Sequence, residues 1–251
     1  MNTDRNGQAV YVILGATGGI GSELSRQLAA QGASLMLGAQ TSEKLEKLAN
    51  ELRAQHFALD ATQTGQVDRC VEQTVETYGR VDGIANCVGS VLLKPAHLTS
   101  DDEWASTIAV NLTTAFATVK AAARAMRRDG GSVVLTSSAA ARVGIANHEA
   151  IAAAKGGIIG LMLSASATYS RNNIRVNCVA PGLVRTPSTE RITNNETSLK
   201  VSLAMHPLGR VGEPSDVASL MVWLLDYRQA WITGQVFGVD GGLGTVHPRL
   251  A

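Results

Sequence analysis

The sequence predicts an α/β fold in which one doubly wound parallel sheet carries helices on both faces. Short β-branched runs alternate along the chain with longer segments of helical period. Strands separated by helix-length segments must be joined by crossovers, which pair the strands in parallel. The chain has 251 residues, 45% of them hydrophobic, and no linker of low complexity. Such a chain buries a sizeable core, so we expect residues 1–251 to form a single domain.

Each element is expected from its local pattern. Strands are expected in short apolar runs, and helices where apolar residues recur at intervals of three and four. The expected strands are residues 10–14, 34–37, 56–59, 83–85, 132–136, 174–179 and 235–239. The expected helices are residues 22–30, 43–52, 67–78, 102–126, 149–169 and 217–225. A short polar tail is expected before the first strand.

Residues 183–210 form the longest stretch without a clear period. Long irregular segments in compact domains are more often lids or binding loops than passive connectors. We therefore expect this segment to cover substrate. The alternative is an ordinary surface excursion.

Composition argues against several classes of partner and location. The 22 basic and 21 acidic residues give a net charge of +1 without a dense basic run, so nucleic acid is not expected. No stretch approaches ~18 uninterrupted apolar residues, and the N-terminal apolar run is too short for a signal sequence. We therefore expect no membrane span. Cys70, Cys87 and Cys178 are far apart and suit buried free thiols in a reducing cytoplasm.

A glycine cluster follows the first expected strand and precedes a segment of helical period. It reads Gly15-Ala-Thr-Gly-Gly-Ile-Gly21. Glycines allow a sharp turn and a close approach of the backbone to a pyrophosphate, and the helix N-terminus offers unpaired amides. A glycine cluster alone also fits a tight turn. Its place between a strand and a helix favours a dinucleotide site.

The spacing G-x-x-x-G-x-G resembles the short-chain dehydrogenase/reductase family, and further motifs extend the resemblance over nearly the whole chain. They are FALDA, ANCVG, AVNL, LTSSAA, AAAKGGIIGL, VNCVAPGLVRTP, HPLGRVGEPSDVA and ITGQVFGVDGG. Cys87 and Val88 depart from the family's N-N-A-G segment. The resemblance, strongest to 3-oxoacyl reductases, implies a Rossmann-type fold. It also implies an NAD(P)(H)-dependent enzyme that interconverts a carbonyl and an alcohol.

The resemblance also implies roles for individual residues. Ser138 would bind the substrate carbonyl, Lys155 would hold the nicotinamide ribose hydroxyls, and Asn111 would hold a water in a proton relay. The implied cofactor contacts are Gly15, Thr17, Gly19, Ile20, Gly21, Gln40, Asp60, Asn86, Gly89, Lys155, Pro181, Gly182, Val184 and Thr186.

One residue of the family's catalytic set is missing. The family places a tyrosine four residues before the lysine, and this chain has Ile151 there. Ser138 keeps the family's interval of 13 residues before position 151. An isoleucine has no proton to give, and a positioned general acid contributes about 10²- to 10⁴-fold, or roughly 3 to 5.5 kcal/mol. We expect slower reduction without loss of the hydride-transfer geometry.

His148 is the candidate replacement. It lies seven residues before Lys155, so on a helix it shares nearly the same face, roughly 4.5 Å along the axis from Ile151. Imidazole titrates near neutral pH and suits proton transfer, directly or through a water. The alternative is that Asn147 caps the helix and the imidazole faces solvent. Glu149 points away from the lysine face.

Other catalytic chemistries find no support in the motifs. The sequence HEAIA lacks the second histidine of a zinc-protease helix, so no metal is expected. There is no G-x-S-x-G elbow to make Ser138 a nucleophile.

Cofactor preference is expected to depend on the segment LMLGAQTSEKL after the second strand. An acid there would accept the ribose hydroxyls of NAD, whereas an arginine would favour NADP. The chain has Gly38 and no acid, and Gln40 stands where related reductases often carry arginine. Because Gln40, Thr41 and Ser42 could hydrogen-bond a 2′-phosphate, we expect NADP(H) to be preferred.

Substrate and assembly are less defined by the sequence. A small carbonyl or alcohol is expected. Arg127, Arg128 and Arg171 are either contacts for an acyl-carrier partner or solvated side chains. The alanine-rich helices at residues 102–126 and 149–169 suit close packing between copies, so a homo-oligomer, tetramer or dimer, is expected.

Two further functions compete with the reductase. The loss of tyrosine favours a weak or inactive nucleotide-binding protein with a regulatory or structural role, whereas retention of Asn111, Ser138 and Lys155 argues against it. The other competing function is a lyase or isomerase that uses the bound nucleotide as a scaffold. No feature of the sequence favours it.

Overall fold

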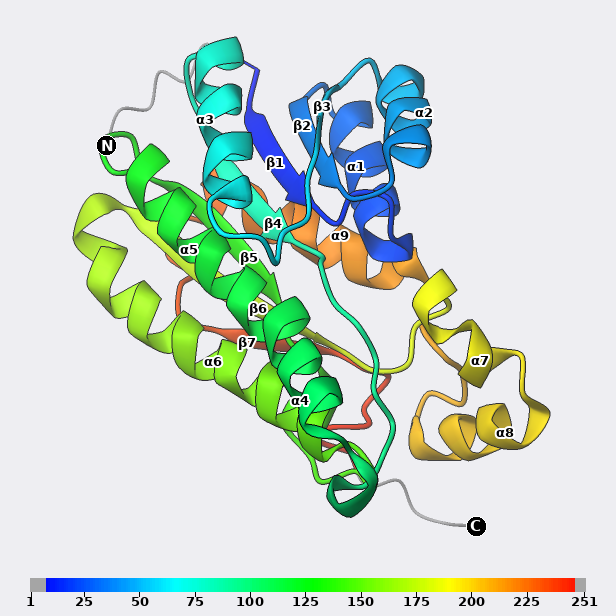
Figure 1. Cartoon of the computed structure of the whole chain (residues 1–251). Helices are drawn as coiled ribbons and strands as arrows, with labels where there is room; N and C mark the ends of the chain where they lie inside the picture. The colour runs from blue at the N-terminus through cyan, green and yellow to red at the C-terminus, as the bar shows by residue number, and fades with distance from the viewer. Residues whose placement is uncertain (1–7, 247–251) are drawn as a thin grey trace.

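The computed structural model describes residues 8–246, in which seven parallel strands form one sheet (Figure 1). The strand order is β3-β2-β1-β4-β5-β6-β7. The strands are β1 (Val10–Leu14), β2 (Ser34–Ala39), β3 (Gln55–Ala58), β4 (Gly83–Asn86), β5 (Gly131–Thr136), β6 (Ile174–Pro181) and β7 (Val236–Val239). The predicted doubly wound α/β fold is confirmed. The expected N-terminal tail, residues 1–7, lies outside the described residues.

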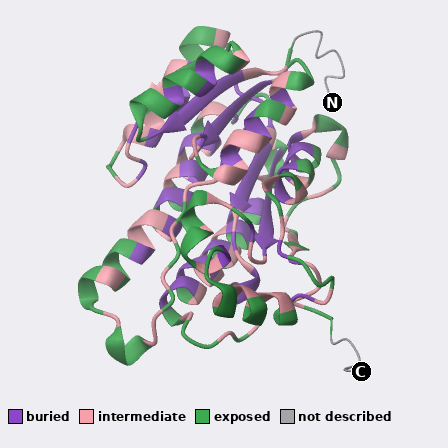
Figure 2. Cartoon of the chain, turned by 90° about the vertical axis from the view of Figure 1, so that its right-hand side faces the viewer, coloured by how far each residue is buried: buried purple, intermediate pink, exposed green. Residues whose placement is uncertain are grey.

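Helices cover both faces of the sheet. The principal helices are α1 (Gly19–Ala30), α2 (Ser42–Leu52), α3 (Gln66–Tyr78), α4 (Asp101–Ile108), α5 (Thr114–Ala125), α6 (Glu149–Tyr169) and α9 (Pro214–Leu225). Buried side chains of α3, α5 and α6 form one core cluster with the sheet, and those of α1, α2 and α9 form a second. The five inner strands, from β2 to β6 in the sheet order, lie almost wholly buried between these layers (Figure 2), whereas the edge strands β3 and β7 are more exposed. Burial on both faces explains why the sequences of the inner strands are continuous apolar runs.

The strand order reverses between β1 and β4. From β1 the chain extends outward to β2 and β3, and it then returns to β4 on the other side of β1. Ligands of open α/β sheets bind at the carboxyl ends of the strands at such a switch point. The glycine turn after β1 and the segment after β4 therefore meet at the expected cofactor crevice.

The predicted single helix over residues 102–126 is wrong in one detail. The helical backbone is continuous, but a π-helical segment (Ala109–Thr113) separates α4 from α5. A π segment adds one residue to a turn and leaves the surrounding apolar pattern almost unchanged, so sequence periodicity does not reveal it. The segment contains Asn111, and such bulges are frequent at functional sites.

Residues 183–210 are more regular than their sequence indicates. They form a short 3₁₀ turn (Pro187–Thr189), α7 (Glu190–Thr193) and α8 (Glu196–Met205). Helix α8 has no fully buried residue, which explains its lack of a clear apolar period. In Figure 1 these helices project beside the carboxyl ends of the strands.

Helix α6 is the one described helix that is long and apolar enough to cross a membrane, counted with the turn that follows it to Asn172. Its residues pack on the sheet in the same core cluster as α3 and α5, and the buried positions include Lys155. This packing accounts for its apolar composition.

Candidate active site

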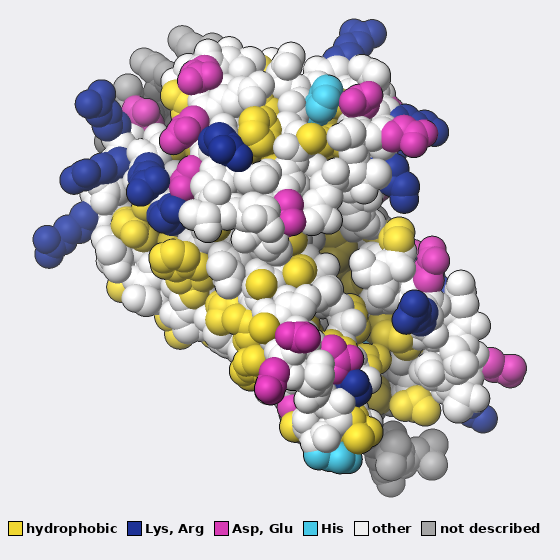
Figure 3. All heavy atoms as spheres, viewed as in Figure 1, with side chains coloured by type: hydrophobic (Ala, Val, Ile, Leu, Met, Phe, Trp, Pro, Cys, Tyr) yellow, Lys and Arg dark blue, Asp and Glu magenta, His cyan; other side chains and the backbone are white. Residues whose placement is uncertain are grey.

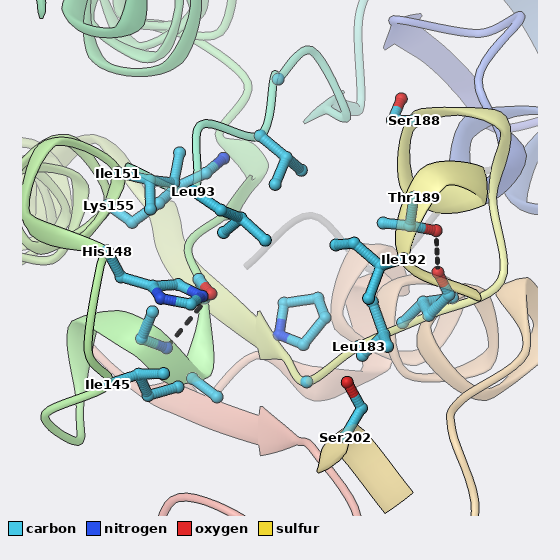
Figure 4. A pocket seen from close by; sticks show the side chains of 18 of the residues that line it. Leu93, Ile145, His148, Ile151, Lys155, Leu183, Ser188, Thr189, Ile192 and Ser202 are labelled. Atoms are coloured by element: carbon cyan, nitrogen blue, oxygen red, sulfur yellow. Dashed lines mark hydrogen bonds between the residues drawn. The ribbon is translucent and has the colours of Figure 1, made fainter. Parts of the chain in front are cut away.

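A cavity of about 770 Å³ opens at the carboxyl end of the sheet. Its walls come from the segments after β4, β5 and β6, the start of α6, and helices α7 and α8. Figure 4 shows side chains from these segments facing one another across it. Figure 3 shows the surface hollowed between the body of the molecule and the α7–α8 segment. The volume is typical of small-molecule and cofactor sites.

The glycine turn packs against neighbouring backbone so closely that side chains do not fit. Gly15 has a φ of +75°, and a Cβ there would lie 2.8 Å from the carbonyl carbon of Cys87. A Cβ at Gly19 would lie 2.7 Å from Cγ2 of Thr186, and one at Gly21 would collide with the Gly15 carbonyl. Helix α1 begins here without a side-chain cap. This cradle fits the pyrophosphate of a dinucleotide, bound by helix N-terminal amides.

Lys155 lies at the floor of the cavity and is 6% exposed. Its Nζ donates a hydrogen bond to the Thr136 carbonyl at 2.8 Å. Burial lowers the pKa of the Lys155 ammonium to about 8, while the thiols of Cys87 and Cys178 oppose that shift. The ammonium lies where it can exchange this backbone carbonyl for the ribose hydroxyls of a bound nucleotide.

Ser138 stands on the same cavity, at the start of a 3₁₀ turn after β5. Its Oγ accepts a hydrogen bond from the Ala140 amide at 3.2 Å. The hydroxyl proton has no acceptor among the described residues. It is therefore available to a substrate carbonyl.

His148 and Ile151 lie at the start of α6, on the wall that also carries Lys155 (Figure 4). Asn147 does not cap the helix, because it has a left-handed φ of +63° and His148 itself is the N-cap residue. His148 therefore precedes α6, and the expectation that it shares a helix face with Lys155 is wrong, although both residues line the cavity. The half-buried imidazole lines the cavity, and its Nδ1 lies 2.7 Å from the Ala146 carbonyl. Ile151 is 5% exposed and presents a purely apolar surface at the tyrosine position.

Two predicted asparagines lie beneath the cavity instead of lining it. Asn111 is 1% exposed; its Nδ2 donates to the Ser90 hydroxyl at 3.0 Å and its Oδ1 accepts from the Ser90 amide at 3.2 Å. Asn86 donates from Nδ2 to Thr118 and accepts from the Val88 amide at 2.8 Å. Both side chains fix the backbone after β4, along which a nucleotide would lie.

Gln40 and Asp60, which are expected near the adenine end of a nucleotide, are not fully buried. The side-chain and backbone hydrogen bonds of Thr62, and further bonds from Gln40 and Gln63, hold the pKa of Asp60 below its usual value. Gln40 itself is exposed at the end of β2. The predicted cofactor residues Gln40 and Asp60 are thus neighbours, although the sequence separates them by 20 positions.

Most of the other predicted cofactor contacts line the cavity. The cavity is lined by Gly19, Ile20, Gly89, Lys155, Pro181, Gly182, Val184 and Thr186. Thr17 lies half-buried in the glycine turn. A Cβ at Gly89 would lie 3.1 Å from Asn111 Oδ1 and 3.3 Å from Lys155 Nζ, so these three residues meet.

Sequence reasoning missed His206. This residue follows α8, is 4% exposed and lines the cavity. Its Nε2 accepts a hydrogen bond from the Leu183 amide at 3.1 Å, and its Nδ1 lies 2.6 Å from the Ser202 carbonyl. A Cβ at Gly182 would lie 2.5 Å from Nε2. A single histidine in HPLGR carries no local signal of this bridge, which depends on tertiary contact.

The cysteines and the remaining acidic residues do not define a second chemistry. All three cysteines are free, and burial raises the pKa of each thiol to about 12. Within residues 8–246, no group of three or more histidine, cysteine or acidic side chains could hold a metal ion.

The fold and the site together define a class of protein. A glycine cradle at the switch point of a doubly wound sheet, with a buried lysine and an available serine hydroxyl beyond it, is the arrangement of a dinucleotide-dependent oxidoreductase. A family model described as "Enoyl-(Acyl carrier protein) reductase" matches residues 15–244. The chain belongs to the short-chain dehydrogenase/reductase family, as its motifs indicate, and this family binds NAD(P).

Individual relatives are similar over nearly the full chain. A 3-oxoacyl-[acyl-carrier-protein] reductase of Thermotoga maritima is 34% identical over 242 residues, which cover 93% of this chain and 97% of the relative. A 2,5-dichloro-2,5-cyclohexadiene-1,4-diol dehydrogenase of Sphingobium indicum is 33% identical over 251 residues, and the alignment covers 97% of this chain and 100% of the relative. Among solved structures, a short-chain dehydrogenase/reductase from Mycobacterium ulcerans has a TM-score of 0.90 and 31% sequence identity. The match covers 94% of this chain and 90% of that chain. The relatives support an oxidoreductase that acts on carbonyl or alcohol substrates.

Proposed function

We propose that this chain is an NADP(H)-dependent reductase or dehydrogenase in which His148 supplies the proton that its family takes from tyrosine. The main observation in favour of this proposal is that His148, Ser138 and Lys155 line the same cavity. An imidazole that donates from Nδ1 to the Ala146 carbonyl keeps Nε2 available to exchange a proton with substrate or water.

The proposed roles follow from this geometry. A bound nicotinamide supplies or accepts the hydride at the substrate carbon. Ser138 donates a hydrogen bond to the substrate oxygen, which gains negative charge as the carbonyl is reduced. The imidazolium of His148 then gives its Nε2 proton to that oxygen, directly or through one water, and regains a proton from solvent. In alcohol oxidation the neutral Nε2 takes the proton. Asn111, whose side chain is bound to Ser90 beneath the cavity, would support a relay water by fixing the segment after β4 and not by contacting the water with its amide.

The test is the oxidation of NADPH and NADH against a broad panel of carbonyl compounds, by the wild type and by His148→Ala. A general acid contributes about 10²- to 10⁴-fold, so we expect His148→Ala to lose at least ~10-fold in kcat while still binding nucleotide. His97→Ala is the matched control, because His97 is exposed in a 3₁₀ turn (Ala96–Leu98) outside the cavity. Equal kcat values for His148→Ala and wild type would reject the histidine.

The preference for NADP(H) is supported by the segment after β2. Residues 38–42 contain no carboxylate to repel a 2′-phosphate. Helix α2 begins at Ser42 with no side-chain cap, so its first amides, together with Gln40 and Thr41, can bind an anion. A solved polyketide ketoreductase variant of the actinorhodin system, described with NADPH, has a TM-score of 0.89 and 29% identity to this chain, over 95% of it and 98% of that chain.

The second candidate function is nucleotide binding without redox turnover. The observation in its favour is Ile151, which replaces a proton donor with a buried apolar side chain. Wild-type protein that binds NADPH but reduces none of the panel would support this function over the first.

Three finer expectations belong to the same proposal. The segment 183–210 covers substrate, since Leu183, Ile192 and Met205 line the cavity. Copies of the chain assemble into a dimer or tetramer through the α4–α6 layer, where Phe116 is 57% and Leu163 is 51% exposed; Figure 3 shows apolar side chains gathered there. The three free thiols favour the cytoplasm.

A further inference from the structure

The substrate end of the cavity is almost devoid of charge. Among the described residues that line it, the titratable cations are Lys155 and the two imidazoles, and no carboxylate is present. The Lys155 ammonium is bound to the Thr136 carbonyl at the floor. Both nitrogens of His206 are engaged with backbone, in the pattern of a neutral ring. Among the described residues that line the cavity, His148 is the one titratable cation left with a free ring nitrogen, and the proposed reaction uses it at the reacting oxygen. The described walls beyond it offer no cation to a substrate carboxylate or phosphate.

Two facing walls of the cavity are apolar, one from the segment after β4 and the other from α8. Val91 and Leu93, after β4, are each 44% exposed, and on α8 Val201 is 57% and Met205 is 38% exposed. All four line the cavity. Large apolar side chains that remain open to solvent in a concave site mark a surface that an apolar ligand would cover.

Apolar contacts continue down to the reacting end. Figure 4 shows Leu93, Ile145 and Ile151 on one side of the pocket and Leu183 and Ile192 on the other. Ile151 extends this apolar surface to the position where the family has a phenol. Burying a charged substrate group against these side chains would cost far more than burying a hydrocarbon ring.

The polar side chains that remain in the lining are neutral, and most of them are hydroxyls. Ser188, Ser198 and Ser202 line the α7–α8 side of the cavity. Hydroxyls can donate to or accept from a second hydroxyl or carbonyl of the ligand, but they do not neutralise a full charge.

An acyl-carrier contact through Arg127, Arg128 and Arg171 does not fit this site. All three are exposed and lie at the amino end of the sheet, before β5 and before β6. The cavity lies at the carboxyl end, beside the start of α6. The 21 residues of α6 span about 30 Å between the two ends. The structure therefore supports the alternative in which these three arginines are solvated surface side chains.

We infer that the substrate is a compact, neutral, largely apolar ketone or alcohol, such as a substituted ring, which carries no carboxylate, phosphate or amine near the reacting centre. This inference deepens the proposed function and rests on it for the reaction itself. The recognition is set by the apolar walls from the β4 segment and α8.

The test compares two ketones of similar shape, 4-tert-butylcyclohexanone and 4-oxocyclohexanecarboxylate. For wild type we expect kcat/KM to favour the neutral ketone by at least ~10-fold, and calorimetric binding to the NADPH-loaded protein to show the same order. Equal or tighter binding of the carboxylate would overturn the inference.

A charge-swap variant sharpens the test. Met205→Lys places a cation on the α8 wall and should reverse the preference toward the carboxylate. Ala204→Lys is the matched control, because Ala204 is an exposed neighbour on α8 that does not line the cavity. If both lysine variants shift the preference equally, long-range charge explains the effect and the inference fails.

Binding and turnover separate this inference from the proposed function. Selective binding of the neutral ketone without turnover would support the ligand class while rejecting the reductase. Turnover of the charged ketone in preference to the neutral one would reject the ligand class while keeping the reductase.

Discussion

The imidazole of His206 joins helix α8 to the backbone of Leu183, whose amide donates to Nε2 at 3.1 Å. The opposite ring nitrogen lies 2.6 Å from the Ser202 carbonyl, so one side chain bridges α8 and the segment that follows β6. That segment contains Pro181, Gly182, Val184 and Thr186, which line the cofactor side of the cavity. His206 thus couples the predicted substrate cover to the predicted nicotinamide contacts.

We predict that His206→Ala destabilises the protein and loosens the nicotinamide site. The change leaves the Leu183 amide without its acceptor and opens a void, which together cost about 2–4 kcal/mol. The free energy of unfolding in urea should fall by that amount, and KM for the cofactor should rise more than kcat falls.

His206→Gln is the informative partner of this variant, because its amide can both accept and donate. It should recover part of the stability and most of the cofactor KM. If His206→Ala alters stability but leaves the cofactor KM unchanged, the bridge is structural and does not position the site.

The sequence predicted the sheet and its helices because burial on both faces imposes short apolar runs, and amphipathic packing imposes a helical period. It could not predict the π segment around Asn111, since one extra residue in a turn barely shifts the apolar pattern. The sequence did not predict helix α8 for a different reason. None of its residues is fully buried, so its sequence shows no apolar period. The bridge of His206 and the pairing of Gln40 with Asp60 both depend on contacts between distant segments, which local patterns do not encode.

We predict that Gln40→Asp shifts cofactor preference toward NADH. A carboxylate after β2 repels the 2′-phosphate of NADPH and accepts the ribose hydroxyls of NADH. KM for NADPH should rise by at least ~10-fold, whereas KM for NADH should fall; steady-state kinetics with both cofactors measures the ratio.

Gln55→Asp is the control for this exchange. Gln55 is exposed at the amino end of β3, which pairs with β2, whereas Gln40 follows the carboxyl end of β2. The control variant should leave both KM values unchanged. A wild type that already uses NADH better than NADPH would refute the proposed preference before any variant is made.

We predict that Lys155→Met stabilises the nucleotide-free protein at neutral pH. Burial lowers the Lys155 pKa from 10.5 to about 8 in the folded state, so the unfolded chain binds more protons between these values and stability rises with pH there. The penalty is fully present below about pH 8. Removing the charge should therefore raise the free energy of unfolding by about 2 kcal/mol at pH 7, net of the lost hydrogen bond.

Urea unfolding of wild type and Lys155→Met across pH 7 to about 10 measures this difference. The gain should shrink as pH rises from about 8 and vanish before pH 10.5, because the burial penalty fades there while the loss of the hydrogen bond remains. Lys200→Met, an exposed lysine on α8, controls for loss of a surface charge. A Lys155→Met protein that is less stable at pH 7 would show that the ammonium is satisfied by its surroundings, contrary to the lowered pKa.

We predict that the effect of Ile151→Tyr depends on His148. If His148 already supplies the proton, a phenol on the same wall adds little, and kcat should rise by no more than ~10-fold in the wild-type background. In the His148→Ala background the same tyrosine should restore most of the lost rate, because a general acid contributes about 10²- to 10⁴-fold. Such non-additivity is the signature of two groups that perform one task. Equal gains in both backgrounds would mean that His148 takes no part in proton transfer, and a gain above ~100-fold in the wild-type background would favour nucleotide binding without turnover as the natural function.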